Sequence, residues 1–249
     1  MKAAFLVVFS LFVASQVSAF NLYKTRSGKR VRWSTVYVEV VLDDSLAELG
    51  SKEDVETALG EAFGIWSRDA MLPLSFELVW DECHDVSNDS NNCIYACSDR
   101  SVCYNRPEEK GGTTYVNVSP STGYITDVDI VLNADSWEWD IDGTNEDGLC
   151  FSRVMSHEIG HFLGIDHSED PEAIMYAVMS RNAVAADWLP VDDKDAATTL
   201  YDDFEEAPVT DDHNACSVAK VGRRGGHDSY VFGMLLALFA ALRLRSRGR

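Results

Sequence analysis

The sequence predicts an α+β fold, and three stretches carry this prediction. Residues 35–42 (TVYVEVVL) are rich in β-branched residues and are typical of a strand. Residues 51–68 begin with Ser-Lys-Glu-Asp, similar to a capping box, and continue with apolar residues at helical spacing. Residues 151–162 repeat this helical spacing. Because 46% of the 249 residues are hydrophobic, the chain can bury one core of ordinary size.

The remaining elements follow from the same patterns. Residues 74–80 alternate and place Phe76, Leu78 and Trp80 on one face of a strand. Residues 113–118 and 127–133 predict two further strands, and a last helix is expected at about 192–201. The residues expected to face the core are Val55, Leu59, Ala62 and Trp66 on the first helix, Val128, Ile130 and Leu132 on the last strand, and Phe151, Met155, Ile159 and Phe162 on the second helix.

The charge of the protein is concentrated in the body of the chain. Overall, 41 Asp and Glu stand against 21 Lys and Arg, a net charge of −20. Residues 20–215 alone hold 40 acidic and 13 basic residues, a net charge of −27. Such a body repels phosphate, so a nucleic-acid partner is disfavoured. We expect the acidic excess to keep the protein soluble, to attract divalent cations and to favour neutral or basic substrates.

Residues 1–19 are predicted to be a secretory signal peptide. Lys2 precedes a short apolar run, and Val17 and Ala19 supply the small residues at −3 and −1 of a cleavage site after Ala19. Residues 20–34 then form a short N-terminal segment before the first strand. The body is therefore expected to be exported to the extracellular space or the cell surface.

The C-terminal end has two parts. Residues 204–229 are expected to be an acidic and then Gly/Arg-rich linker containing Cys216, and residues 230–249 are expected to form an apolar helix with an arginine cluster. The 13 apolar residues 230–242 would span about 20 Å as a helix, short of the roughly 30 Å hydrocarbon core. This order resembles bacterial C-terminal sorting tails of the Myxo-CTERM type, which implies a processing address with transient membrane association. An ordinary tail anchor, which would tether the body permanently outside the cytoplasm, is the alternative.

A polar stretch at residues 81–112 carries four of the six cysteines. They are Cys83, Cys93, Cys97 and Cys103. Export, together with the absence of a compact CxxC pair, favours disulfides over a zinc site here. Cys150 makes five cysteines in the body, so they cannot all pair with one another, and the connectivity stays open.

Residues 157–167 (HEIGHFLGIDH) carry the chemistry. His157 and His161 are four residues apart and project from one face of a helix, where both imidazoles can reach one metal ion. Gly164 can end this helix in a left-handed C-cap and turn the chain, so that His167 returns as a third ligand. Three imidazoles leave a fourth zinc position open for water, which is the catalytic arrangement. Glu158 is then placed to act as general base in peptide-bond hydrolysis by a zinc-activated water.

The motif HExxHxxGxxH resembles the zinc signature of metzincins, which carry a methionine turn downstream. Residues 173–176 (AIMY) are similar to that turn, with Met175 as a floor residue and not a ligand. The run HSEDPEAIMY resembles the matrixin, or matrix-metalloprotease-like, branch. This resemblance implies a metzincin/zincin-like catalytic domain over residues 35–203, in which a mixed twisted sheet packs with two long helices, the zinc helix and a short C-terminal helix.

The resemblance also implies roles for further residues. The edge strand that pairs with substrate would be Thr113, Thr114, Tyr115, Val116, Asn117 and Val118. The S1′ wall would be Tyr176, Ala177, Val178 and Met179, in which no proline follows the Met-Tyr pair as it usually does in the family. Calcium is common in the family, and an oxygen-rich loop offers Asp140, Asp142, Glu146 and Asp147, although a solvated acidic loop fits equally well. Only His84 precedes the zinc helix as a further histidine of the body, so one zinc ion is expected, and the segment before the first strand lacks the family's latency cysteine.

The sequence thus predicts an exported zinc metalloendopeptidase with a polypeptide substrate and a monomeric body. The alternative is a cell-surface binding module that retains the metzincin fold without turnover, and hydrolysis of another amide or ester at the same zinc is a third possibility. Glu158 favours an enzyme, because a binding module needs no base beside the metal.

Overall fold

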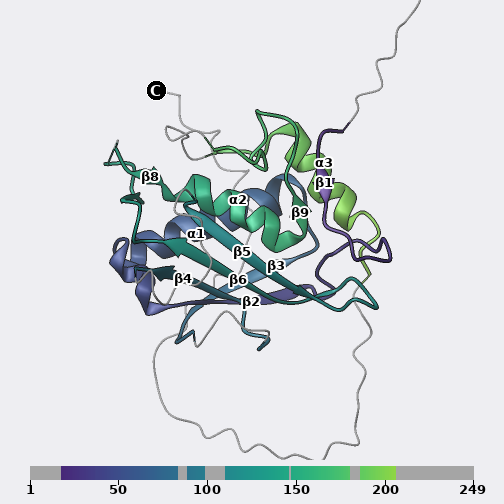
Figure 1. Ribbon diagram of the computed structural model, residues 1–249, viewed down its shortest axis with the longest axis horizontal. Helices are drawn as coiled ribbons and strands as arrows, with labels where there is room; N and C mark the ends of the chain where they lie inside the picture. The colour runs from purple at the N-terminus through teal and green to yellow at the C-terminus, as the bar shows by residue number, and fades with distance from the viewer. Residues whose placement is uncertain (1–17, 84–88, 99–109, 146, 180–185, 206–249) are drawn as a thin grey trace, which may run out of the picture. The chain divides into compact units, whose positions relative to one another are not determined.

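The computed structural model describes residues 18–83, 89–98, 110–145, 147–179 and 186–205 (Figure 1). Nearly all of the predicted signal peptide, most of the linker and the whole C-terminal tail lie outside these residues. None of the helices within the described ranges is long and apolar enough to cross a membrane.

One five-stranded sheet forms the base of the domain, in the order β3-β2-β4-β6-β5. Its strands are β2 (Tyr37–Leu42), β3 (Ser75–Trp80), β4 (Cys93–Cys97), β5 (Gly112–Val118) and β6 (Ile125–Asn133). Neighbours pair in parallel except for β5, which runs antiparallel to β6 at the edge of the sheet. Two short pairs lie outside it: β1 (Asn21–Leu22) with β9 (Ile165–Asp166), and β7 (Trp139–Asp140) with β8 (Leu149–Cys150).

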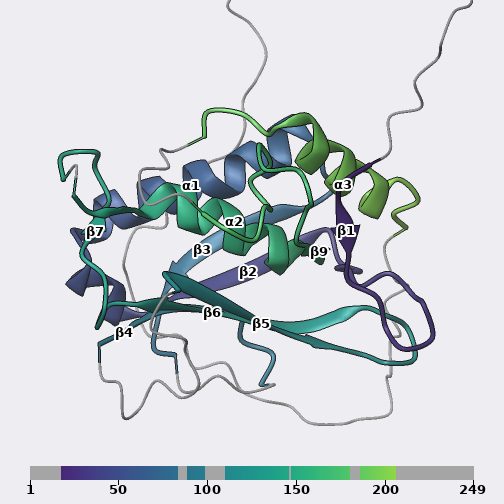
Figure 2. The ribbon, with the colours of Figure 1, turned by 45° about the horizontal axis from the view of Figure 1, so that its top comes forward.

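The helices are α1 (Lys52–Asp69), α2 (Phe151–Leu163) and α3 (Val191–Tyr201), with a short 3-10 turn η1 (Asp44–Glu48) after β2. Figure 2 shows α1 and α2 on the same face of the sheet. Ser51 caps α1 as the sequence predicts, since its hydroxyl accepts a hydrogen bond from the Asp54 N–H. The predicted α+β arrangement of a mixed sheet with two long helices and a C-terminal helix is therefore confirmed.

The core lies between the sheet and these helices. All the core-facing residues predicted on α1, α2 and β6 are buried, among them Trp66 and Ile130, which are fully inaccessible. Phe63, Phe76 and Phe162 form a cluster from α1, β3 and α2, with ring centroids 4.7–6.1 Å apart. Full burial of such a side chain contributes about 1.5–3 kcal/mol, which applies to Phe63 and Phe162, whereas Phe76 is partly buried. This packing fixes α2 above the sheet.

From the sequence, residues 81–112 were described only as a polar stretch, and no strand was predicted at residues 93–97. These five residues form β4, which pairs with β2 and β6 in the interior of the sheet. Cys93 and Cys97 at its ends are buried, and Cys93 is disulfide-bonded to Cys83. Cys97 is also disulfide-bonded, so the preference for disulfides over zinc is confirmed for these residues, whereas Cys150 has a free thiol.

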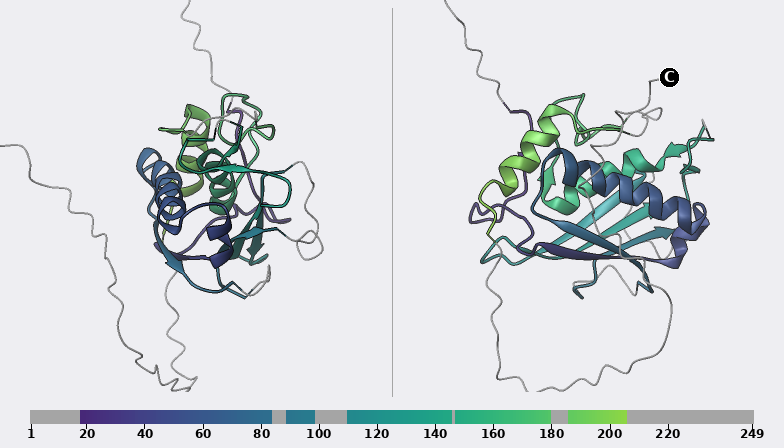
Figure 3. Two further views of the ribbon diagram at one scale, coloured as in Figure 1. Left: turned by 90° about the vertical axis from the view of Figure 1, so that its left-hand side faces the viewer. Right: turned by 180° about the vertical axis from the view of Figure 1, so that it is seen from behind.

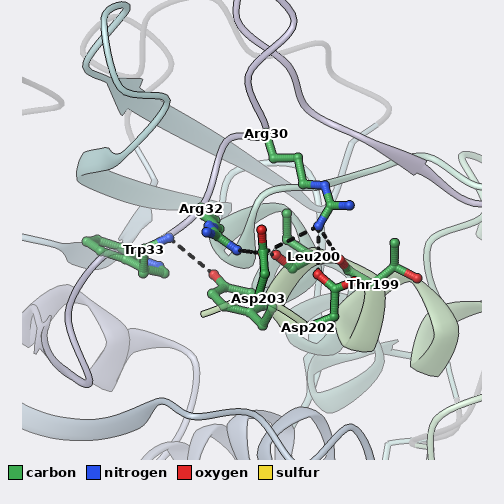
Figure 4. Close-up of polar contacts among 8 residues, drawn as sticks. Arg30, Arg32, Trp33, Thr199, Leu200, Asp202 and Asp203 are labelled. Carbon is green, nitrogen blue, oxygen red and sulfur yellow. Dashed lines mark hydrogen bonds and ion pairs between the residues drawn. The ribbon is translucent and has the colours of Figure 1, made fainter. Parts of the chain in front are cut away.

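The N-terminal segment packs against α3, as two further views show (Figure 3). Arg30 and Arg32 donate hydrogen bonds to the Thr199 and Leu200 carbonyls and also pair with acidic residues just after the helix (Figure 4). These carbonyls have no partners within the helix, and the cations lie at the negative end of its dipole. The Tyr201 hydroxyl accepts a hydrogen bond from the Trp33 N–H and donates one to the Leu163 carbonyl. The segment thereby connects α3 to the end of α2.

Candidate metal centre

The third histidine comes close to the other two because the chain reverses after α2. Gly164 has φ +103° and caps the helix in the left-handed conformation that the sequence predicts. A Cβ there would lie 2.0 Å from the Val31 carbonyl oxygen, so only glycine fits. β9 then pairs with β1 (Figure 2), and this pairing turns His167 back toward the helix. Ligand atoms of His157, His161 and His167 all lie within 4.8 Å of one another.

Backbone carbonyls determine which ring nitrogens face the site. The His157 Nδ1 lies 2.7 Å from the Ile174 carbonyl oxygen, and the His161 Nδ1 lies 2.8 Å from that of Ile165. A carbonyl only accepts, so each Nδ1 carries the proton and each Nε2 presents a lone pair. The Nε2 atoms of His161 and His167 are 3.3 Å apart. Two nitrogens at 2.0–2.1 Å from a tetrahedral zinc would be separated by about 3.3 Å, so the residues fit this ion.

The three imidazoles are held neutral, which is the form that binds metal. Burial, together with the neighbouring His161, lowers the pKa of His157 to about 3. Burial also lowers the pKa of His161 to about 4, against the hydrogen bond to Ile165. The pKa of the less buried His167 is lowered as well, again mainly by burial. No proton has to be displaced from these rings at neutral pH when a cation binds.

The methionine turn is held in place from α3. Asp193 is 1% exposed, and its carboxylate accepts hydrogen bonds from the N–H groups of Ile174 (2.6 Å) and Met175 (2.9 Å). Burial raises the pKa of Asp193 to about 6, although these hydrogen bonds lower it. Because the Ile174 carbonyl accepts a hydrogen bond from His157, Asp193 on α3 positions the His157 imidazole through a single intervening residue. The sequence reasoning missed Asp193, since its partners are 18 and 19 residues away and no local pattern marks it.

Met175 packs closely against α2, and its role as a floor residue stays a prediction. It is fully buried, and a Cβ added at Gly160 would lie 2.1 Å from its sulfur and 3.0 Å from Trp66 Cζ2. The glycine between Glu158 and His161 therefore allows the methionine to approach the helix backbone. This use of Gly160 was also missed from the sequence.

Glu158 follows the first ligand and is 6% exposed. The Thr114 hydroxyl on β5 donates a hydrogen bond of 2.6 Å to its Oε2. Burial raises the pKa of Glu158 to about 7, and this hydrogen bond and the charge of Lys110 act in the opposite direction. A carboxyl group with a pKa near neutrality can both accept and release a proton under working conditions.

Tyr23 is a further residue at the site that the sequence did not indicate. Its hydroxyl lies 3.1 Å from the His161 Nδ1, and the two rings stack with centroids 5.6 Å apart. Since that Nδ1 carries a proton directed at Ile165, the phenol oxygen serves as a second acceptor. Burial, together with the charges of Asp166 and Glu158, raises the pKa of Tyr23 to about 12.

The remaining predicted residues are placed as follows. Residues 113–118 belong to β5, which is an edge strand as expected and lies beside α2 (Figure 1). Tyr176 forms an isolated bridge with Ser168, Val178 is exposed, and Met179 is partly buried against the core. These positions are compatible with the substrate roles that the sequence suggests, which stay predictions.

The calcium candidates make local hydrogen bonds. Asp140 accepts from the Asn145 N–H, and Asp142 accepts from the N–H and hydroxyl of Thr144. Glu146 lies outside the described residues. Within the described ranges, the three histidines are the one group of at least three His, Cys, Asp or Glu residues close enough to hold a metal ion. Calcium at this loop stays a prediction.

Comparison with known proteins assigns the chain to a family. A family model described as matrixin matches residues 32–202. The chain belongs to the matrixin family. Membership confirms the resemblance seen in the zinc motif and the methionine turn, and with it the metzincin-type fold.

Individual matrixin relatives are distant. Macrophage metalloelastase from Oryctolagus cuniculus is 28% identical over 202 residues, which cover 77% of this chain and 40% of that protein. Metalloendoproteinase 1-MMP from Arabidopsis thaliana is 28% identical over 161 residues, or 61% of this chain and 39% of that protein. Matrix metalloproteinase-18 from Xenopus laevis is 32% identical over 149 residues, or 59% of this chain and 29% of that protein. The matrixin chain thus spans well under half the length of these relatives.

Proposed function

We propose that this matrixin is an exported zinc-dependent metalloendopeptidase that hydrolyses peptide bonds with Glu158 as general base. The observation that carries the proposal is the combination of three neutral imidazoles, with Nε2 atoms spaced for one zinc ion, and a buried carboxyl group of raised pKa next to them. A structural zinc site needs four protein ligands and no base, whereas three ligands with a base form a hydrolytic site.

His157, His161 and His167 would hold the ion. When bound, zinc supplies a Lewis acid that polarises the substrate carbonyl and makes water a stronger acid. The carbonyls of Ile174 and Ile165 keep the imidazoles of His157 and His161 in the required tautomer and orientation. The fold therefore orients His157 and His161 before any metal binds.

Glu158 would handle the proton. Its carboxylate accepts a proton from the water that attacks the scissile carbonyl and delivers it to the departing amine. A pKa near 7, caused mainly by burial, suits both transfers. Because Oε2 is hydrogen-bonded to Thr114, Oε1 is the oxygen available for the transfer.

The substrate would lie along β5 as an added antiparallel strand. This strand is at the sheet edge, and its partner β6 covers only one side of it. An extended peptide can take up the free backbone groups of such an edge. Residues 176–179 would line the adjacent S1′ pocket, and the net charge of −27 over residues 20–215 favours neutral or basic peptides.

The test uses the purified full-length chain and a peptide library, with and without a zinc chelator, and mass spectrometry to locate the cuts. We expect endoproteolytic cuts that disappear with chelator and with Glu158→Gln. Absence of cutting in every condition would support the binding module instead. Cutting that survives the chelator would remove the zinc mechanism, and cutting unchanged in Glu158→Gln would remove the general base.

Export and sorting are separate parts of the proposal. They rest on residues 1–19 and 230–249, most of which lie outside the described ranges. N-terminal sequencing of protein recovered from outside the producing cell should begin at Phe20. Mass spectrometry of the same material should reveal whether the chain ends before residue 230 or carries a modified Cys216. A chain beginning at Met1 inside the cell would contradict export.

A further inference from the structure

A hydrogen bond joins the edge strand β5 to helix α2, and the HExxHxxGxxH motif does not predict it. The Thr114 hydroxyl lies 2.6 Å from Oε2 of Glu158 and 3.2 Å from the Glu158 backbone carbonyl oxygen. It has a single proton to donate. The shorter distance and the charge on the carboxylate favour Oε2 as the acceptor.

The donor is rigidly held. Thr114 lies opposite Ile130 in the antiparallel ladder of β5 and β6, and Ile130 is fully buried. A β-branched side chain on a strand has few alternative χ1 positions. The hydroxyl therefore keeps its place, while a glutamate has three side-chain torsions that must be restricted before its carboxylate points in one direction.

Gly112 completes the restraint from the same face of β5, because residues two apart on a strand project to the same side. A Cβ at residue 112 would lie 2.9 Å from Cγ and 3.0 Å from Oε1 of Glu158. The strand backbone thus packs against the carboxylate at Gly112, while Thr114 holds the other oxygen. Glu158 is confined between these two residues and its own helix.

We propose that Thr114 is a positioning residue for Glu158, holding Oε2 so that Oε1 is directed at the water that the reaction consumes. The inference rests on the proposed function and adds a residue to it. The edge strand then has two tasks: its backbone is expected to bind the substrate, and its side chain at residue 114 orients the base. The interaction acts on proton transfer and not on substrate binding.

The kinetic test replaces Thr114 with valine, which has the same shape without the hydroxyl, and with serine, which keeps it. We expect Thr114→Val to lower kcat about tenfold or more with KM unchanged, as for loss of a hydrogen bond to a charged group. Thr114→Ser should recover most of the loss. Thr57→Val, on the exposed face of α1, is the matched control and should behave as wild type. Wild-type kcat in Thr114→Val, or a change confined to KM, would overturn the inference.

A second measurement does not depend on zinc or on turnover. In metal-free full-length protein, the urea midpoint is measured for Thr114→Val, Glu158→Leu and the double variant, which form a double-mutant cycle. We expect Thr114→Val to lower the midpoint in the wild-type background and to leave it unchanged or raise it in the Glu158→Leu background. Equal shifts in both backgrounds would refute the contact. If wild type cuts no peptide, the proposed function fails, and the cycle still decides whether Thr114 restrains Glu158.

Discussion

Replacement of Gly160 by alanine tests whether the close approach of Met175 to helix α2 requires a glycine at this position. In an open helix interior, alanine is about 1 kcal/mol more favourable than glycine. At residue 160, however, the new Cβ would lie 2.1 Å from the Met175 sulfur and 3.0 Å from both Met175 Cε and Trp66 Cζ2. Both neighbours are fully buried, so neither can swing into solvent.

The expected net effect follows from two opposing terms. Overpacking of a dense core costs about 1–3 kcal/mol. The overlap between the new Cβ and the Met175 sulfur would be larger than the overlap that an added methyl group usually causes. Displacing Met175 also disturbs the turn whose carbonyl at Ile174 holds His157. Since the conflict outweighs the gain in helix propensity, we expect Gly160→Ala to lower the free energy of unfolding by about 1–2 kcal/mol. For a domain of this size this corresponds to a melting temperature lower by about 2–8 °C.

The assay is thermal and urea unfolding of metal-free protein, with Gly64→Ala as the matched control. Gly64 lies within α1, and a Cβ there would meet nothing within 4 Å, so this variant should be more stable than wild type. Combining Gly160→Ala with Met175→Ala should remove most of the penalty of the first substitution. A Gly160→Ala variant as stable as the Gly64→Ala variant would refute the packing argument.

Three further predictions concern the base, the methionine turn and the metal. Burial raises the pKa of Glu158 to about 7, so the folded chain binds this proton more tightly than the unfolded chain does. The resulting stabilisation is complete below the unfolded pKa and is lost as the pH rises through the folded pKa, so the free energy of unfolding of the metal-free wild type, relative to that of Glu158→Gln, should fall by about 3 kcal/mol between about pH 4.5 and 7. A difference in urea unfolding that stays constant with pH would contradict this. Asp193→Asn should turn an amide NH₂ group toward the N–H of Ile174 or Met175 and destabilise the protein by about 1–3 kcal/mol. Its zinc content, measured by elemental analysis, should be lower than that of wild type, and full zinc occupancy would exclude the positioning of His157 by Asp193 through Ile174. Removal of zinc should abolish peptide hydrolysis, and one equivalent of Zn²⁺ should restore it; activity that does not return with zinc alone would indicate a further required ion.

The accuracy of the sequence-based predictions depended on the range of the interactions involved. The helix 52–69, the strand 75–80 and the strand 125–133 match the predicted elements to within about two residues at each end. The missed strand β4 has only five residues, of which two are cysteines. Its sequence has too little alternation to stand out, and its identity as a strand comes from pairing with β2 and β6 on both sides.

The sequence alone was enough to propose the three histidines as metal ligands, Glu158 as the base and the reversal of the chain at Gly164, because these follow from spacing along one helix and from the conformational freedom of one glycine. Only the tertiary structure identified Thr114, Asp193, Tyr23 and Gly160 as parts of the site. Three of these act through partners that lie 18 to 138 residues away, and Gly160 matters only because the methionine turn packs against it. A helical period records which residues share a face, whereas the neighbours of that face are selected by packing of the whole chain.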